Sequence, residues 1–236
     1  MKLLVSVVSA EEARRALAGG ADIVDVKDPR EGPLGAPAPQ VLSEVVRAVG
    51  DAAPVSVALG DLPDLPHSGA LDGVAYIKVG LRGAGTLDCA VAVMSAVTDA
   101  AGPHAAVIAV TYADGRALDP PALAPAALPK LVERTGIAGA LVDTFVKDGR
   151  GLYAWLSEPA LAELVAHTRA AGGTFGIAGQ LRLDDLRRVD ADVVGVRSAV
   201  CRGGDRAAEL DSELVSAAVA ELRGGAMVRL APGRVR

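Results

Sequence analysis

Eight short apolar segments recur along the chain, roughly every 25 to 30 residues, and segments with helical spacing separate most of them. The predicted strands are residues 3–7, 21–27, 55–59, 76–80, 105–111, 138–143, 174–178 and 192–196. The predicted helices are residues 9–18, 41–49, 86–101, 120–135, 157–171, 181–189 and 209–223. A strand followed by a helix, repeated along the chain, is the pattern of an α/β fold with a parallel sheet.

The number of predicted strands favours a (β/α)8 TIM barrel built as a single domain. We expect this domain to span residues 1–224 and residues 225–236 to form a basic, frayed C-terminal tail. An open, doubly wound sheet is the alternative, but it usually has fewer strands. In addition, no Gly-x-Gly-x-x-Gly follows the first predicted strand.

Composition narrows the possible partners. Of the 236 residues, 51% are hydrophobic and 3% are aromatic, which is typical of an α/β enzyme core. The net charge of −5 gives no general attraction to nucleic acid or to an anionic membrane, so we expect neither as a partner. With two cysteines far apart and no visible export signal, we expect a cytoplasmic protein without disulfides. Helix faces rich in Ala and Val leave room for a homo-oligomer.

Lysine is rare among the basic residues: of 24 Lys and Arg, only five are Lys. The other 19 basic residues are all arginine. Unlike a guanidinium, an ammonium group can readily lose its proton. The remaining lysines therefore indicate positions where a free amine is useful.

Three of the five lysines fall at or just beyond the ends of alternate predicted strands, together with two carboxylates. These residues are Asp25, Lys27, Lys78, Asp143 and Lys147. Because active sites of (β/α)8 barrels lie at the C-terminal ends of the strands, we expect these side chains to meet at one mouth. Burial and a neighbouring ammonium lower the pKa of a lysine, and the free amine can then attack a carbonyl while a carboxylate relays protons. The alternative is that Asp25–Lys27 and Asp143–Lys147 are ion pairs that fasten loops.

The loops after the last two predicted strands are candidates for phosphate binding, because barrels commonly bind a phosphate there. Glycine lets the backbone N–H groups approach the anion, and an arginine can contact it with two donors. The candidate residues are Gly179, Gln180, Arg197, Ser198, Gly203 and Gly204. The alternative is that Gly179 only begins a helix and that Gly203 and Gly204 belong to a loop before the last helix. The histidines and cysteines show no metal-ligand spacing, so we predict no metal site.

Four charged motifs, taken together, resemble the (5-formylfuran-3-yl)methyl phosphate synthase family, which makes the furan precursor of methanofuran. They are Asp-Ile-Val-Asp-Val-Lys-Asp-Pro-Arg-Glu-Gly-Pro-Leu-Gly-Ala from Asp22, Tyr-Ile-Lys-Val-Gly-Leu from Tyr76, Val-Asp-Thr-Phe-Val-Lys-Asp-Gly from Val142, and Val-Gly-Val-Arg-Ser-Ala-Val-Cys-Arg-Gly-Gly-Asp-Arg from Val194. The resemblance runs from the first predicted strand to the last predicted helix.

The resemblance implies a (β/α)8 barrel that condenses two glyceraldehyde 3-phosphate molecules into 4-(hydroxymethyl)-2-furancarboxaldehyde phosphate, releasing phosphate and water. It implies Lys27 as the Schiff-base lysine, Lys78 as the base, and Asp25, Asp143 and Lys147 as supporting residues. It also implies that no metal or other cofactor takes part. Two alternatives remain: a Schiff-base aldolase acting on another phosphorylated aldehyde, and a non-catalytic barrel that binds a phosphorylated ligand.

Overall fold

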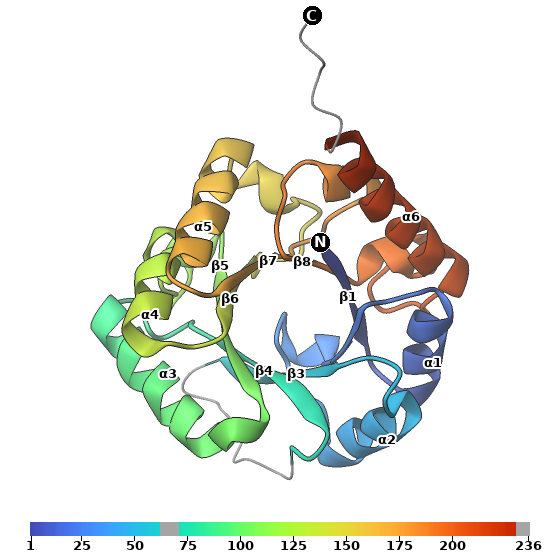
Figure 1. Cartoon of the computed structure of the whole chain (residues 1–236), viewed down its shortest axis with the longest axis horizontal. Helices are drawn as coiled ribbons and strands as arrows, with labels where there is room; N and C mark the ends of the chain where they lie inside the picture. The colour runs from blue at the N-terminus through green and yellow to red at the C-terminus, as the bar shows by residue number, and fades with distance from the viewer. Residues whose placement is uncertain (62–70, 230–236) are drawn as a thin grey trace, which may run out of the picture.

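The computed structural model describes residues 1–61 and 71–229, and its eight parallel strands close into a barrel in chain order, as Figure 1 shows. The first strand pairs with both the second and the eighth, which closes the ring. The single-domain (β/α)8 barrel is therefore confirmed. The strands are β1 (Lys2–Val7), β2 (Ile23–Val26), β3 (Val55–Asp61), β4 (Val74–Gly80), β5 (Ala106–Tyr112), β6 (Gly139–Asp143), β7 (Thr174–Ile177) and β8 (Val193–Val196).

Six α-helices surround the barrel in the described part of the chain (Figure 1). They are α1 (Ala10–Ala18), α2 (Pro39–Val49), α3 (Leu87–Ala101), α4 (Leu128–Thr135), α5 (Glu158–Ala170) and α6 (Ser212–Arg229). Their starts follow local rules: Ser9, for example, caps α1 by accepting a hydrogen bond from the N–H of Glu12 at 3.2 Å. None of the described helices combines the length and the apolar character needed to cross a membrane.

Three predicted helices differ most from the structure. The helix predicted over 120–135 begins only at Leu128, because prolines 120, 121 and 125 lack the N–H that a helix interior requires. Between β7 and β8 the chain forms a short 3-10 helix, η6 (Leu183–Arg187), in which the N–H of Arg182 donates to Asp185 Oδ2. The last helix continues to Arg229 instead of ending at residue 223, and the rest of the predicted tail, residues 230–236, lies outside the described residues.

Strand register determines which side chains face the barrel interior. Ser6 on β1 lies opposite Asp25 on β2, and Asp25 lies opposite Ser56 on β3. Because side chains alternate along a strand, the neighbours of these polar residues, including Val24 and Val57, pack outward into the core under the helices. The interior of the barrel therefore contains a layer of polar side chains, formed by Ser6, Asp25 and Ser56.

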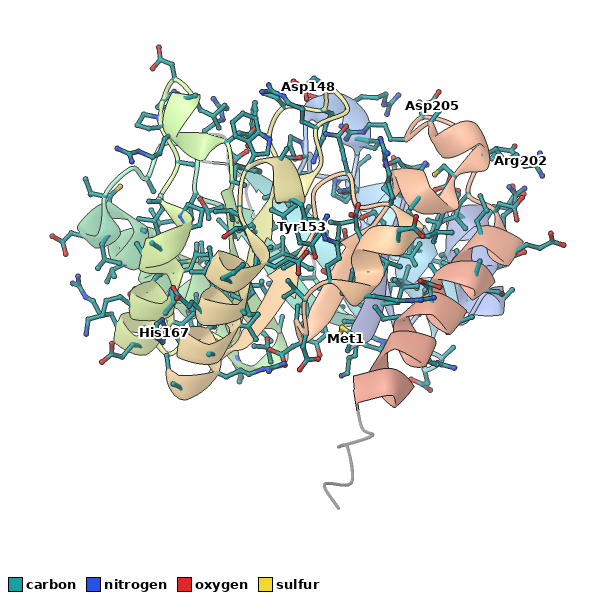
Figure 2. All side chains as sticks on the ribbon, turned by 90° about the horizontal axis from the view of Figure 1, so that it is seen from above. Met1, Asp148, Tyr153, His167, Arg202 and Asp205 are labelled. Atoms are coloured by element: carbon teal, nitrogen blue, oxygen red, sulfur yellow. The ribbon has the colours of Figure 1, made fainter. Side chains whose placement is uncertain are left out.

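The two ends of the barrel are distinct. Figure 2 shows Asp148 and Asp205, in the loops after β6 and β8, at one end of the molecule, with Met1 and His167 at the other. The first end is where the strands finish. The loops that follow the strands therefore surround the residues at the strand ends, including Lys27 and Asp143.

Candidate active site

The barrel closure brings Lys78 on β4 to Asp25 on β2, although 53 residues separate them in the sequence. Lys78 Nζ donates to Asp25 Oδ2 at 2.7 Å, and both side chains are at most 5% exposed. The Ser6 hydroxyl donates to the same carboxylate oxygen at 2.9 Å. The suggested Asp25–Lys27 loop-fastening pair is therefore wrong, because Lys78 is the ion-pair partner of Asp25.

A second ion pair lies at the end of β6. Lys147 Nζ donates to Asp143 Oδ1 at 2.7 Å, and the Thr144 N–H donates to the same oxygen at 2.7 Å. Burial alone would raise the pKa of the Asp143 carboxyl, but the charges of Lys147 and Lys27 and these hydrogen bonds lower it below its ordinary value. Asp143 is therefore an ionised carboxylate at the barrel mouth.

Lys27 lies between the two pairs and forms no ion pair with a described carboxylate. Its Nζ donates to the backbone oxygen of Pro33 at 3.1 Å, and the residue is 9% exposed. Burial lowers the pKa of Lys27 from 10.5 to about 8; Asp143 and Asp25 oppose this shift, while Lys78 and Lys147 add to it. About a tenth of this amine is therefore unprotonated at pH 7, far more than for an ordinary lysine, and the unprotonated form is the one that attacks a carbonyl.

A cavity of about 260 Å³ connects this cluster to the loops after β7 and β8. None of the N–H groups of Gln180, Leu181 and Ser198 donates to another described backbone oxygen, so they can receive an anion. Of the predicted phosphate-binding residues, Gly203 does not line this cavity. Those that do are Gly179, Gln180, Arg197, Ser198 and Gly204.

The Arg197 side chain is already fully engaged. Its guanidinium pairs with Glu12 at the start of α1 and donates to the backbone oxygens of Ser6, Arg206 and Ala208. This set of contacts fastens the loop after β8 to the first βα unit. A phosphate would have to compete for donors that have partners, and the role of Arg197 in phosphate binding stays a prediction.

The Gln180 side chain points toward a neighbouring loop. Its Nε2 donates to the Arg150 oxygen at 2.8 Å, and its Oε1 accepts from the Gly149 N–H at 3.0 Å. Gln180 also adopts a positive φ of 50°, next to Gly179 at 110°. The side chain therefore holds the loop after β6, and the backbone is the part that can serve a phosphate.

Arg206 is a cavity residue that the sequence reasoning did not select. It lines the mouth cavity and a neighbouring cavity of about 380 Å³, and Lys27 lines both as well. One of its nitrogens donates to the oxygens of Pro29 and Gly32 at 3.2 and 3.5 Å, and burial lowers its pKa. It has no carboxylate partner among the described residues. The Gly-Gly-Asp-Arg motif contains it, but the direction of its side chain depends on the turn at Gly203 and Gly204.

Cys201, on the loop after β8, has a thiol that stays protonated at neutral pH. It is buried, and burial raises its pKa to about 11. Across the described ranges 1–61 and 71–229, no group of three or more His, Cys, Asp or Glu residues is arranged to hold a metal ion.

Comparisons with known proteins agree on one family. The model of the 4-HFC-P synthase family matches residues 3–219. The chain is 39% identical over 234 residues to the (5-formylfuran-3-yl)methyl phosphate synthase of Methanosarcina mazei, covering 94% of this chain and 99% of the relative. It is 40% identical over 218 residues to the enzyme of the same name from Methanopyrus kandleri, covering 87% and 91%.

Solved structures resemble this chain in fold alone. Phosphoribosyl anthranilate isomerase from Thermotoga maritima superposes with a TM-score of 0.62 at 12% identity, covering 95% of this chain and 99% of the isomerase. Thiamine phosphate pyrophosphorylase from Pyrococcus furiosus gives 0.59 at 18% identity, covering 98% and 97%.

Replacing Lys27 by methionine should stabilise the protein near neutral pH. The unfolded chain binds a proton at this lysine up to pH 10.5, whereas the folded chain releases it near pH 8, so folding is disfavoured below that range. Lys27→Met should therefore raise the free energy of unfolding at pH 7 by up to about 3 kcal/mol. The gain should shrink as the pH rises from 8 to 10.5.

Urea unfolding at pH 7 and at pH 10 measures this difference. Lys130→Met provides the matched control, because Lys130 is exposed and pairs with Glu133 on the surface of α4. A Lys27→Met protein that is no more stable than the wild type at pH 7 would contradict the low pKa of the buried amine.

Proposed function

Because this chain belongs to the 4-HFC-P synthase family, an enzyme family, we propose that it condenses two molecules of glyceraldehyde 3-phosphate into (5-formylfuran-3-yl)methyl phosphate. All atoms of the two substrates are accounted for when one inorganic phosphate and two water molecules leave. The observation that supports this proposal best is Lys27, a buried amine with a pKa of about 8 between two lysine–carboxylate pairs.

The first step is attack of the Lys27 amine on the aldehyde of one triose phosphate. Addition gives a carbinolamine, and loss of its hydroxyl as water leaves an iminium ion. Departure of that hydroxyl requires a proton. The Lys147 ammonium, held at Asp143 by a 2.7 Å hydrogen bond, is a donor at the same mouth.

The second step is removal of the proton from C2, which the iminium makes acidic. Lys78 Nζ lies on the barrel interior, and Asp25 and Ser6 hold the pair in place. Lys78 first passes its ammonium proton to Asp25, to which it is hydrogen-bonded, and so becomes a free amine. When the C2–H bond breaks, its electron pair forms the enamine C1=C2 bond and the proton passes to the Lys78 amine. Carbon–carbon bond formation with the second triose phosphate, loss of phosphate, ring closure and dehydration complete the reaction.

The two substrates bring two phosphate groups, and two cavities meet at Lys27. Arg206 borders both cavities, and burial without a carboxylate partner makes its guanidinium a site where an anion is favoured. We assign Arg206 and the free backbone N–H groups after β7 and β8 to the binding of the phosphate of one triose phosphate. This arrangement also suits a Schiff-base aldolase that acts on another phosphorylated aldehyde. Because the chain belongs to the synthase family, the aldolase is the second candidate.

Reduction by borohydride tests the iminium. In the presence of glyceraldehyde 3-phosphate, the wild-type protein should gain the mass of one reduced triose phosphate on Lys27, located by peptide mass spectrometry. Lys27→Arg should gain none, because a guanidinium does not form the iminium, and furan formation, followed by ultraviolet absorbance, should fall by at least a thousandfold. Lys130→Arg should behave as the wild type.

Lys78→Met separates the two steps. It should still trap the triose phosphate on Lys27 but form no furan. Wild-type protein that gains no mass under reduction would leave only a binding function. Trapping without furan absorbance in the wild type would support the aldolase instead.

Arg206→Met should raise the KM for glyceraldehyde 3-phosphate by about tenfold or more, because it removes a charge-assisted contact to phosphate worth about 1.5–3 kcal/mol. Arg202→Met is the matched control from the same loop. Arg202 is two-thirds exposed and lies toward the outside of the molecule, as Figure 2 shows. Equal effects of the two substitutions on KM would contradict a phosphate contact at Arg206.

A further inference from the structure

A cavity of about 410 Å³ lies within the N-terminal half of the barrel, on the opposite side of Lys78 from the mouth. Its lining runs from Met1, Lys2 and Val193, where strands begin, up to Lys78. Figure 2 places Met1 at the end of the molecule opposite Asp148 and Asp205. The lower half of the barrel is therefore hollow, whereas barrel interiors are usually filled by layers of side chains.

Exposure of the interior side chains agrees with this cavity. Tyr76 and Ile108 line the cavity and are partly exposed. Ile77, which points outward under the helices, is only 1% exposed. Solvent therefore reaches the inside of the barrel from the N-terminal end.

Two buried oxygen atoms near this cavity have no hydrogen-bond partner among the described residues. One is Ser56 Oγ, on a residue that lines the cavity, and the other is Asp25 Oδ1, on the register partner of Ser56. Asp25 and Ser56 are 0% and 1% exposed, and they are register partners on β2 and β3. The other oxygen of Asp25 already accepts from Ser6 and Lys78. A buried hydroxyl and carboxylate each need a partner, and a water between two such groups supplies both.

We propose that this cavity is a water path that exchanges protons between the Lys78–Asp25 pair and solvent at the N-terminal end, with Ser56 positioning the water beside Asp25. The proposal rests on the proposed function, in which Lys78 takes the C2 proton. At that point Asp25 holds the proton that Lys78 gave it, and Asp25 releases this proton to the water and onward to bulk solvent. The Lys78–Asp25 ion pair is thereby restored, so the step balances without another reactant.

The geometry explains why a second path is useful. Lys78 lines both the mouth cavity and the lower cavity. When two triose phosphates occupy the mouth, they cover Lys78 from that side. The lower cavity then provides the route by which Lys78 exchanges its proton.

Hydrogen exchange at C2 tests this path separately from the iminium. In deuterated water, wild-type protein should exchange the C2 hydrogen of glyceraldehyde 3-phosphate, followed by NMR. In Ser56→Ala, exchange and furan formation should fall at least tenfold, while borohydride trapping on Lys27 keeps its wild-type yield. Ser56→Thr retains the hydroxyl and should recover most of the exchange. Ser43→Ala, on the exposed face of α2, is the matched control.

Two results would overturn the proposal. One is C2 exchange in Ser56→Ala within twofold of the wild type, and the other is a loss of trapping equal to the loss of exchange, which would mark Ser56 as merely structural. Failure of the proposed function looks different, because wild-type protein itself would then show neither trapping nor exchange.

Discussion

The site depends on the electrostatic cost of burying several charges inside one closed barrel. Asp25 and Lys78 form a fully buried ion pair, and Asp143 and Lys147 form a second, nearly buried pair at the same mouth. Each charge is compensated by its partner and by hydrogen bonds, as a low-dielectric interior requires. Lys27 lacks such a partner among the described residues, and burial lowers its pKa to about 8, which is why we propose it as the nucleophile of the cluster.

The same network explains why the amines do not act alike. Lys78 and Lys147 each donate to a carboxylate at 2.7 Å and can carry protons, while the Lys27 amine donates only to a backbone oxygen among the described residues. Neighbouring positive charges add to the effect of burial on Lys27. In the proposed mechanism, the placement of two carboxylates therefore divides the three lysines into one nucleophile and two proton carriers.

The framework around the mouth is held by contacts between the loops that follow the strands and the first βα unit. Arg197 connects the end of β8 to Glu12 on α1 and to its own loop, and Gln180 holds the loop after β6. These contacts keep the backbone N–H groups and Arg206 in place around the cavity. Rigid loops of this kind reduce the entropy that substrate binding would otherwise cost.

Much of this arrangement follows from local sequence. Strand ends, helix caps and the alternation of side chains predicted the barrel and placed Asp25, Lys27, Lys78 and Asp143 at one end, because parallel strands in such a fold finish at the same edge. The helix bounds were less predictable where several prolines, or a short 3-10 helix, replaced regular turns.

Tertiary structure alone decided the partners. Asp25 pairs with Lys78, 53 residues away, instead of with nearby Lys27, because closure of the barrel and its strand register determine which interior side chains meet. The orientation of Arg206 depends on an irregular turn, and the hollow lower barrel depends on how side chains from all eight strands fill a shared volume. Short-range patterns in the sequence carry the type and position of a residue, whereas its charge partner and its free space depend on residues that only the folded chain brings together.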